Sequence, residues 1–163
     1  YTAPPLSYKY LALGEVSVFL MWGPLMVEGA YFVQRQALSA KAFWVSLPFG
    51  TLVARVILAN NIRDVQNDRK RGILTLPILL GQKKGRILYL ALVASAYISV
   101  VWMSLAGVLP LWSLFVLLSI PLSWRLFAEL TRNIPIDADA RTAQLDTAFG
   151  VLLVVSLVLE GLF

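Results

Sequence analysis

The sequence predicts an all-α protein, a polytopic bundle of transmembrane helices, and three observations lead to this prediction. Hydrophobic residues make up 59% of the 163 residues and charged residues only 14%, whereas a soluble domain carries roughly 25% charged residues. The segment 87–109 contains no charged residue. Several apolar segments approach the ~20 residues that a helix needs to cross the hydrocarbon layer.

We predict five spans, which make up one membrane domain, residues 1–163; the spans lie at 16–33, 42–59, 87–106, 109–128 and 144–162. The third and fourth spans form a hairpin whose turn contains Gly107 and Pro110. Gly23 and Pro24 are expected to kink the first span. A soluble fold is disfavoured, because a core of this size does not bury so many apolar segments.

The basic residues divide unequally between the two faces that these spans define. The first face holds residues 1–15, 60–86 and 125–143, and it carries most of the lysines and arginines; the second face holds only Arg35 and Lys41. By the positive-inside rule the first face is cytoplasmic and the C-terminus lies on the opposite side. The net charge of +5 is therefore a topology signal, and we expect no nucleic-acid partner.

Two absences limit the possible chemistry. The chain has no cysteine, which excludes thiolate metal sites within it. It has no histidine either, which removes imidazole as a base, nucleophile or ligand.

Arg55 and Glu28 lie well inside the first two predicted spans and need partners or an exit to water. Arg55 is expected either to extend its guanidinium toward the first face or to approach a phosphate site there. Glu28 lies far from that face, and we expect it to pair with a polar residue near the second face.

Polar residues gather where the second span reaches the first face. Asn60, Asp64 and Asp68 follow i, i+4, i+8 spacing on an apolar helix that is expected to continue until Gly72. Two carboxylates on one stripe repel each other unless a cation lies between them. Oxygen ligands of this kind suit Mg²⁺, and Arg63, Arg69, Lys70 and Arg71 would provide charge for phosphate oxygens. A solvated, charged helix end remains the alternative.

The pattern Asn60-Asn61-x-Arg63-Asp64-x-x-x-Asp68-Arg69-x-x-Gly72, followed by Thr75-Leu76 and Leu80-Gly81, resembles the second aspartate motif of the UbiA superfamily of intramembrane prenyltransferases. Upstream, Lys9-Tyr10-x-Ala12-Leu13-Gly14-Glu15 and Gly23-Pro24-Leu25 resemble the middle portion of the same family, and Arg141-Thr142-Ala143-x-Leu145 resembles its last cytoplasmic turn. The paired asparagines resemble the branch that prenylates 1,4-dihydroxy-2-naphthoate in menaquinone (vitamin K2) synthesis.

This resemblance implies a fold of nine spans, of which the chain would supply five as the C-terminal half. It implies a Mg²⁺-dependent enzyme that transfers a polyprenyl group from an isoprenyl diphosphate to an aromatic acceptor. The partners would be these two substrates, the lipid bilayer and the missing N-terminal half of the same protein. The fragment alone is expected to be inactive, because the first aspartate motif would precede Tyr1.

Carried over to this sequence, the resemblance implies that Asp64 and Asp68 hold Mg²⁺ and diphosphate, with Asn60 and Asn61 orienting metal-bound water or phosphate. Lys9 would contact diphosphate, or it anchors the helix at the basic face. Arg69 clamps phosphate or flanks Asp68. Tyr1 would line the acceptor site, or it is a frayed end.

Two other functions remain open at this stage. The first is a related prenyltransferase whose acceptor is a phenolic quinone precursor, a porphyrin-type ring or glyceryl phosphate. The second is a non-catalytic membrane subunit of a larger assembly. Asp137 and Asp139 are expected in a loop beside Pro135, outside any second motif.

Overall fold

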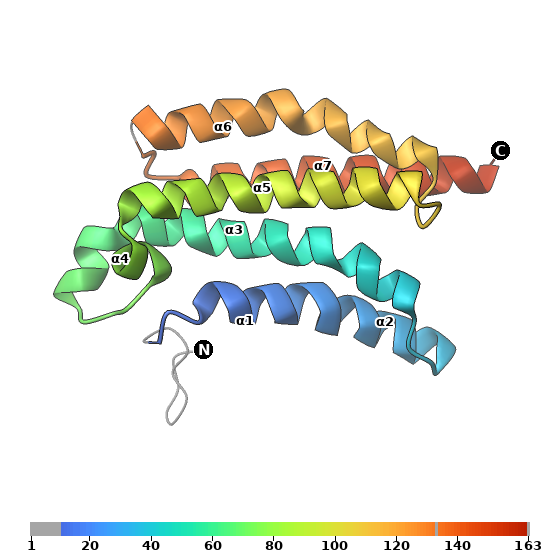
Figure 1. Cartoon of the computed structure of the whole chain (residues 1–163), viewed down its shortest axis with the longest axis horizontal. Helices are drawn as coiled ribbons and strands as arrows, with labels where there is room; N and C mark the ends of the chain where they lie inside the picture. Colours follow the sequence, from blue (N-terminus) through green and yellow to red (C-terminus); the bar gives the residue numbers. More distant parts are fainter. Residues whose placement is uncertain (1–10, 133, 163) are drawn as a thin grey trace.

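The computed structural model describes residues 11–132 and 134–162, and every regular element within them is a helix. Five of these helical segments are long and apolar enough to cross a membrane; they are Gly14–Arg35, Ala40–Lys70, Gln82–Leu105, Leu111–Arg132 and Ala138–Leu162. The predicted all-α, membrane-spanning class is confirmed. The segments lie side by side as elongated rods that alternate in direction (Figure 1).

The first span consists of α1 (Gly14–Leu20), a π-helical turn η2 (Met21–Leu25) and α2 (Met26–Arg35). The π-helical turn contains Pro24, which has no backbone N–H and interrupts the regular hydrogen-bond ladder. The π-helical turn lies where the sequence predicts a kink, at Gly23 and Pro24; the kink itself stays a prediction.

The second span, α3 (Ala40–Lys70), continues without a break through the polar cluster. Ser39 caps its N-terminus by accepting a hydrogen bond from the Ala42 N–H (3.3 Å). The Ser39 N–H in turn donates to Oε2 of Glu28 (3.2 Å), which confirms that Glu28 pairs with a polar group near the second face. Beyond the C-terminus, Gly72 adopts φ +67°, a left-handed conformation that favours glycine.

A short helix α4 (Leu76–Leu80) leads into α5 (Gln82–Leu105). The hairpin turn contains Gly107, whose φ is +72°, as the sequence predicted. A 3₁₀ segment η3 (Leu111–Ser119) and α6 (Ile120–Arg132) form the fourth span, and α7 (Ala138–Leu162) forms the fifth. The start predicted for this last span, residue 144, is too late by almost two turns, so the expectation that Asp139 lies in a loop is wrong: it is in the first turn of α7.

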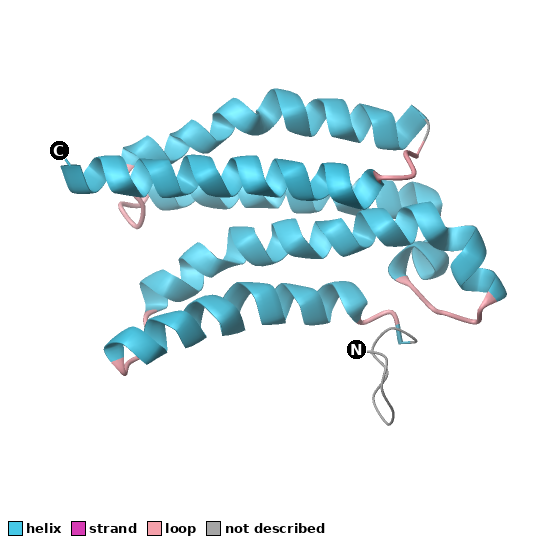
Figure 2. Ribbon diagram, turned by 180° about the vertical axis from the view of Figure 1, so that it is seen from behind, coloured by secondary structure: helices cyan, strands magenta, loops and turns pink. Residues whose placement is uncertain are grey.

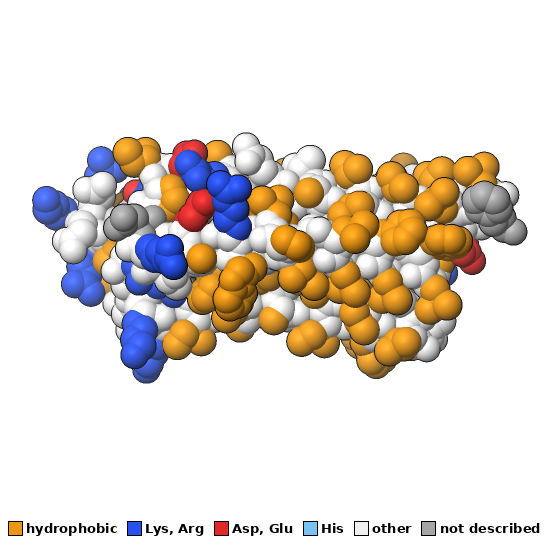
Figure 3. Space-filling view, turned by 90° about the horizontal axis from the view of Figure 1, so that it is seen from above, with side chains coloured by type: hydrophobic (Ala, Val, Ile, Leu, Met, Phe, Trp, Pro, Cys, Tyr) orange, Lys and Arg blue, Asp and Glu red, His pale blue; other side chains and the backbone are white. Residues whose placement is uncertain are grey.

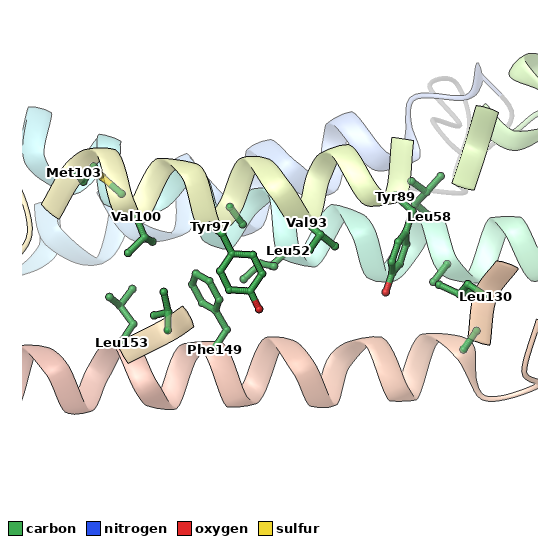
Figure 4. Packing of buried hydrophobic residues seen from close by; sticks show 14 of the residues in the cluster. Leu52, Leu58, Tyr89, Val93, Tyr97, Val100, Met103, Leu130, Phe149 and Leu153 are labelled. Carbon is green, nitrogen blue, oxygen red and sulfur yellow. The ribbon is translucent and has the colours of Figure 1, made fainter. Parts of the chain in front are cut away.

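Helix α3 occupies the middle of the bundle, where it contacts the first span on one side and α5 and α7 on the other. Helix α7 also packs against η3 and α6 (Figures 1 and 2). The buried hydrophobic cluster lies between α3, α5 and α7 (Figure 4), where the rings of Tyr97 and Phe149 meet edge to face with 5.3 Å between centroids.

The first span approaches α3 very closely at a pair of glycines. A Cβ added to Gly23 would lie 2.9 Å from the Cα of Gly50, and a Cβ added to Gly50 would lie 2.8 Å from the carbonyl oxygen of Phe19. Both obstacles are backbone atoms, so no side-chain rotation relieves them. Small residues at such crossings let helices in membranes pack closely.

Replacing Gly50 with alanine is therefore expected to separate α1 from α3 and to destabilise the full-length protein by about 1–3 kcal/mol, as overpacking does elsewhere. The matched control is Gly29→Ala, because a Cβ at Gly29 meets nothing within 4 Å. Thermal unfolding in detergent, followed by size-exclusion chromatography, measures the difference. Equal midpoints for the two variants would contradict the close packing described here.

The outer surface shows the expected division between lipid-facing and polar regions. On the face that Figure 3 shows, apolar side chains cover most of the length of the rods, whereas Lys and Arg gather toward one end. We call this the basic end; its exposed cations include Arg69, Lys70, Arg71, Lys83, Lys84 and Arg132. The C-terminal end of α3, with the aspartate motif, lies at the same end (Figure 1).

Candidate active site at the basic end of helix α3

The predicted site residues Asn60, Asp64 and Asp68 all lie on the continuous helix α3. At ~1.5 Å rise per residue, each is displaced about 6 Å along the axis from the next. Asp68 is buried, with 8% of its surface exposed, and the Asp64 side chain is 29% exposed. Neither carboxylate projects fully into solvent from the part of the chain that the structure describes.

The side chain of Arg63 connects Asn60 and Asp64. Its Nε donates to Oδ1 of Asp64 (2.9 Å) and its Nη2 donates to Oδ2 of the same carboxylate (3.0 Å). The same Nη2 also donates to the side-chain oxygen of Asn60. A guanidinium that holds a carboxylate through two parallel bonds fixes both its charge and its orientation. Arg63, the preceding residue in the sequence, therefore fixes the orientation of the Asp64 carboxylate.

The opposite edge of the same guanidinium reaches the last span. Nη1 of Arg63 donates to Oδ1 of Asp139 (2.8 Å) and to the carbonyl oxygen of Ile136 (2.6 Å). Asp139 is thereby linked to the motif through Arg63, although the sequence predicts that it lies outside any such motif. The sequence contains only a weak indication of this role for Asp139: its carboxylate follows Pro135 closely and stands at the start of an apolar segment.

The paired asparagines point in different directions. Whereas Asn60 faces Arg63, Asn61 is buried and its side-chain amide donates to Oε1 of Glu15 on α1 (2.8 Å). Glu15 is itself only 4% exposed. Asn61 thus contributes to the contact between α1 and α3, and its predicted role toward diphosphate stays a prediction.

The loop after the motif folds back against the first span. The Ile73 N–H donates to the carbonyl oxygen of Asp68 (2.9 Å), and the Ala12 N–H donates to the carbonyl oxygen of Leu74 (3.1 Å). Arg69 is exposed beside Asp68, which is compatible with either of its predicted roles. The remaining predicted site residues, Lys9 and Tyr1, lie outside the described residues.

Arg55 does not behave as the sequence suggested. Its side chain is fully buried and forms an ion pair with Asp146 of α7, donates to the carbonyl oxygen of Thr142 (3.3 Å) and lies 5.3 Å from the ring centre of Tyr89. Neither extension to the surface nor approach to a phosphate site is therefore correct. Charges inside a membrane pair with one another, and Asp146, an acidic residue in the last span, was the overlooked signal.

An apolar groove of about 630 Å³ lies along the first span. It follows α1 and η2 past Leu13, Val16 and Leu20, and Ile57 of α3 completes its wall. Because seven and eleven residues are close to two and three helical turns, Ile57 shares one stripe of α3 with Asp64 and Asp68. The groove wall and the acidic side chains thus follow each other along the same side of the helix.

The donor set fits a magnesium ion that is shared with a phosphate ligand. Carboxylate and amide oxygens are the ligands that Mg²⁺ accepts, and it commonly uses only one or two carboxylates with water and phosphate oxygens. Within residues 11–132 and 134–162 there is no group of three or more His, Cys, Asp or Glu side chains that would hold a metal alone. Asp64 and Asp68 would supply the protein ligands from this chain.

Comparison with known families decides which class of protein carries this site. The model of the UbiA prenyltransferase family matches residues 1–156, nearly the whole chain. The chain belongs to this family. The resemblance drawn from the motif around Asp64 and Asp68 is thereby confirmed, and the family is one of enzymes that transfer prenyl groups.

Individual relatives agree with this assignment. The chain is 34% identical to a 1,4-dihydroxy-2-naphthoate octaprenyltransferase from Bacillus subtilis over 98% of its own length and 53% of that protein. It is 30% identical to the human UbiA prenyltransferase domain-containing protein 1, over 94% of this chain and 45% of that protein. A protein of the same name from Dictyostelium discoideum is 35% identical over 64% of the chain and 32% of that relative. The chain spans about half the length of the curated relatives it matches.

Proposed function

We propose that the protein to which this chain belongs transfers a polyprenyl group from an isoprenyl diphosphate to 1,4-dihydroxy-2-naphthoate in menaquinone synthesis, in a Mg²⁺-dependent reaction. The observation that carries the proposal is the stripe of α3 on which Ile57, at the groove, is followed by Asp64 and Asp68. A diphosphate with an apolar tail has the same polarity pattern. The relative from Bacillus subtilis, named as a naphthoate octaprenyltransferase, supports the choice of acceptor.

In this reaction the bond between C1 of the prenyl chain and the diphosphate oxygen breaks, and the diphosphate leaves with the bonding electrons. Mg²⁺, when bound, would stabilise the negative charge that develops on the leaving group. Asp64 and Asp68 would hold the ion, and Arg63 keeps Asp64 oriented before substrate arrives. Groups fixed in advance where charge develops lower the barrier without reorganising during the reaction.

An electron-rich ring carbon of the acceptor then supplies the electron pair that forms the new bond to C1. Where this carbon carries the carboxylate of the naphthoate, that group would leave as CO₂, and the electrons of the broken bond would restore the aromatic ring. The allylic cation must be protected from water until this bond forms. The groove lined by Leu13, Val16 and Leu20 is apolar and would hold the prenyl chain close to the motif. The remaining walls of the substrate cavity would come from the N-terminal half of the protein.

The proposed orientation places the basic end and the reaction in the cytoplasm, with the C-terminus of α7 on the other side. The asymmetric distribution of Lys and Arg supports this topology. Labelling single cysteines introduced at Lys84 and Glu160 with a membrane-impermeant reagent tests it. Residues 1–163 contain no cysteine, and any cysteine elsewhere in the protein is replaced first.

The function is tested with the full-length protein in membranes. Labelled geranylgeranyl diphosphate is supplied with 1,4-dihydroxy-2-naphthoate, 4-hydroxybenzoate or glyceryl phosphate, each with Mg²⁺ or with EDTA. Prenylated naphthoate that forms only with Mg²⁺ is the expected product. A product from another acceptor alone would reject the naphthoate assignment, and transfer that persists in EDTA would reject the metal dependence.

A further inference from the structure

The guanidinium of Arg63 lies between two carboxylates that belong to different spans. Asp64 on α3 accepts two hydrogen bonds from one edge of the group, and Asp139 on α7 accepts one from the other edge together with the Ile136 carbonyl. The side chain of Arg63 is 24% exposed and that of Asp139 is 40% exposed. The two charge pairs are therefore partly shielded from water but remain accessible to ions.

This arrangement makes Arg63 a competitor for the carboxylate that the proposed function assigns to the metal. Both oxygens of Asp64 accept hydrogen bonds from Arg63. A divalent cation that binds Asp64 therefore either displaces one of these bonds or shares an oxygen with a guanidinium whose positive charge opposes the cation. Arg63 cannot become neutral by losing its proton. Its positive charge must therefore be balanced by another group when the cation arrives.

We propose that Asp139 is a positioning residue that supplies this balancing charge and thereby sets how strongly Arg63 competes with a divalent cation for Asp64. The inference rests on the proposed function for the identity of the site. With Asp139 ionised, Arg63 keeps one carboxylate partner after it releases Asp64. With Asp139 neutralised, Arg63 has Asp64 as its only charged partner among the described residues and holds it more firmly.

Asp137 provides a matched control two residues away. It is exposed, and its carboxylate accepts hydrogen bonds from Nε of Arg141 (2.9 Å to each oxygen). These bonds lower the pKa of the Asp137 carboxyl below its usual value. Arg141 also donates to Glu129 (2.9 Å), so this second network is separate from the contacts of Arg63 that the structure describes. Neutralising Asp137 removes the same charge from the same region without changing the partners of Arg63.

The test measures Mn²⁺ binding to the full-length protein in the presence of inorganic pyrophosphate, with free Mn²⁺ followed by electron paramagnetic resonance. Asp139→Asn is expected to weaken Mn²⁺ binding about three- to fivefold, the upper part of the range for losing a partly exposed charge pair. Asp137→Asn is expected to stay within about twofold of the unmodified protein. Asp139→Glu, which keeps the charge, is expected to restore most of the affinity.

A second background separates an effect through Arg63 from a direct attraction between Asp139 and the metal. In Arg63→Gln the competitor is absent, so adding Asp139→Asn is expected to change Mn²⁺ affinity by less than about twofold. The same loss in both backgrounds, or no loss in Asp139→Asn, would overturn the inference. If Asp139→Asn does not fold, Arg63→Gln alone decides: tighter Mn²⁺ binding supports the inference, and unchanged or weaker binding overturns it.

The readout is independent of prenyl transfer. Absence of transfer to any acceptor by the unmodified protein would reject the proposed function, while the Mn²⁺ measurements would still decide the role of Asp139. Normal transfer together with Mn²⁺ affinities that do not respond to Asp139→Asn would reject this inference alone.

Discussion

Replacing Asp64 with alanine in the full-length protein is expected to lower Mg²⁺-dependent prenyl transfer by at least about 100- to 1000-fold, the cost of losing one preplaced group that acts on developing charge. The substitution removes a proposed metal ligand and leaves Arg63 without the carboxylate that it holds through two bonds. Asp68→Ala is expected to cause a loss of similar size. Initial rates with saturating labelled diphosphate and naphthoate measure both effects.

The variants should still insert and fold. After the loss of Asp64, Arg63 retains Asp139 and the Ile136 carbonyl, so the contact between α3 and α7 persists. Gln66→Ala is the control, because Gln66 is exposed on the same turn of the helix and should keep the normal rate. Full activity of both Asp64→Ala and Asp68→Ala would refute the assignment of the site.

The second large effect concerns stability rather than catalysis. Arg55 and Asp146 form an ion pair in which the arginine side chain is fully buried and the aspartate side chain is 15% exposed. Removing one partner of a buried pair typically costs about 3–5 kcal/mol because the other charge is left without compensation. Arg55→Met and Asp146→Leu are each expected to lower the free energy of unfolding by about this amount.

The two single substitutions should not be equal. In Arg55→Met the remaining carboxylate can take up a proton and become neutral, whereas in Asp146→Leu the remaining guanidinium stays charged. Asp146→Leu is therefore expected to be the more damaging. The double variant Arg55→Met/Asp146→Leu removes both charges and should recover most of the loss, as buried pairs replaced by apolar residues do elsewhere.

The full-length variants are heated in detergent, and the fraction of each that remains monodisperse is measured. These fractions rank the variants by stability. Arg125→Met is the matched control, because it removes an arginine that is 79% exposed and pairs with Glu129 on its own helix; a change within about 1 kcal/mol is expected. A double variant that is less stable than both single variants would contradict the account of a charge pair whose main cost is desolvation.

The features predicted correctly from sequence are those that depend on local pattern. The length of an apolar run determines a span, and Gly107 permits the hairpin turn. Helix α3 meets no proline or glycine between Gly50 and Gly72, so it continues through Asn60 and Asp64. The pairing of Glu28 near the second face was also predictable, because a carboxylate at that depth requires a donor. All of these depend on residues close to one another in the chain.

What the sequence did not reveal depends on which spans are neighbours. Arg55 and Asp146 are separated by 91 positions, and their pairing follows only once α3 and α7 are known to be in contact. The same is true of Arg63 and Asp139, with the added difficulty that Asp139 was assigned to a loop. The backbone carbonyl of Asp137 accepts a hydrogen bond from the Arg141 N–H (3.0 Å), so the helix begins directly after Asp137 despite the nearby proline.

Helix α3 contains 31 residues, so at ~1.5 Å per residue it extends for about 46 Å, whereas the hydrocarbon layer is about 30 Å thick. With the N-terminus of α3 at the opposite boundary of that layer, the surplus would carry the aspartates to the depth of the lipid headgroups. An amphiphile bound there would keep its ionic head hydrated while its tail stays among acyl chains. Such a ligand would arrive by lateral diffusion within one leaflet, without the cost of being extracted into water.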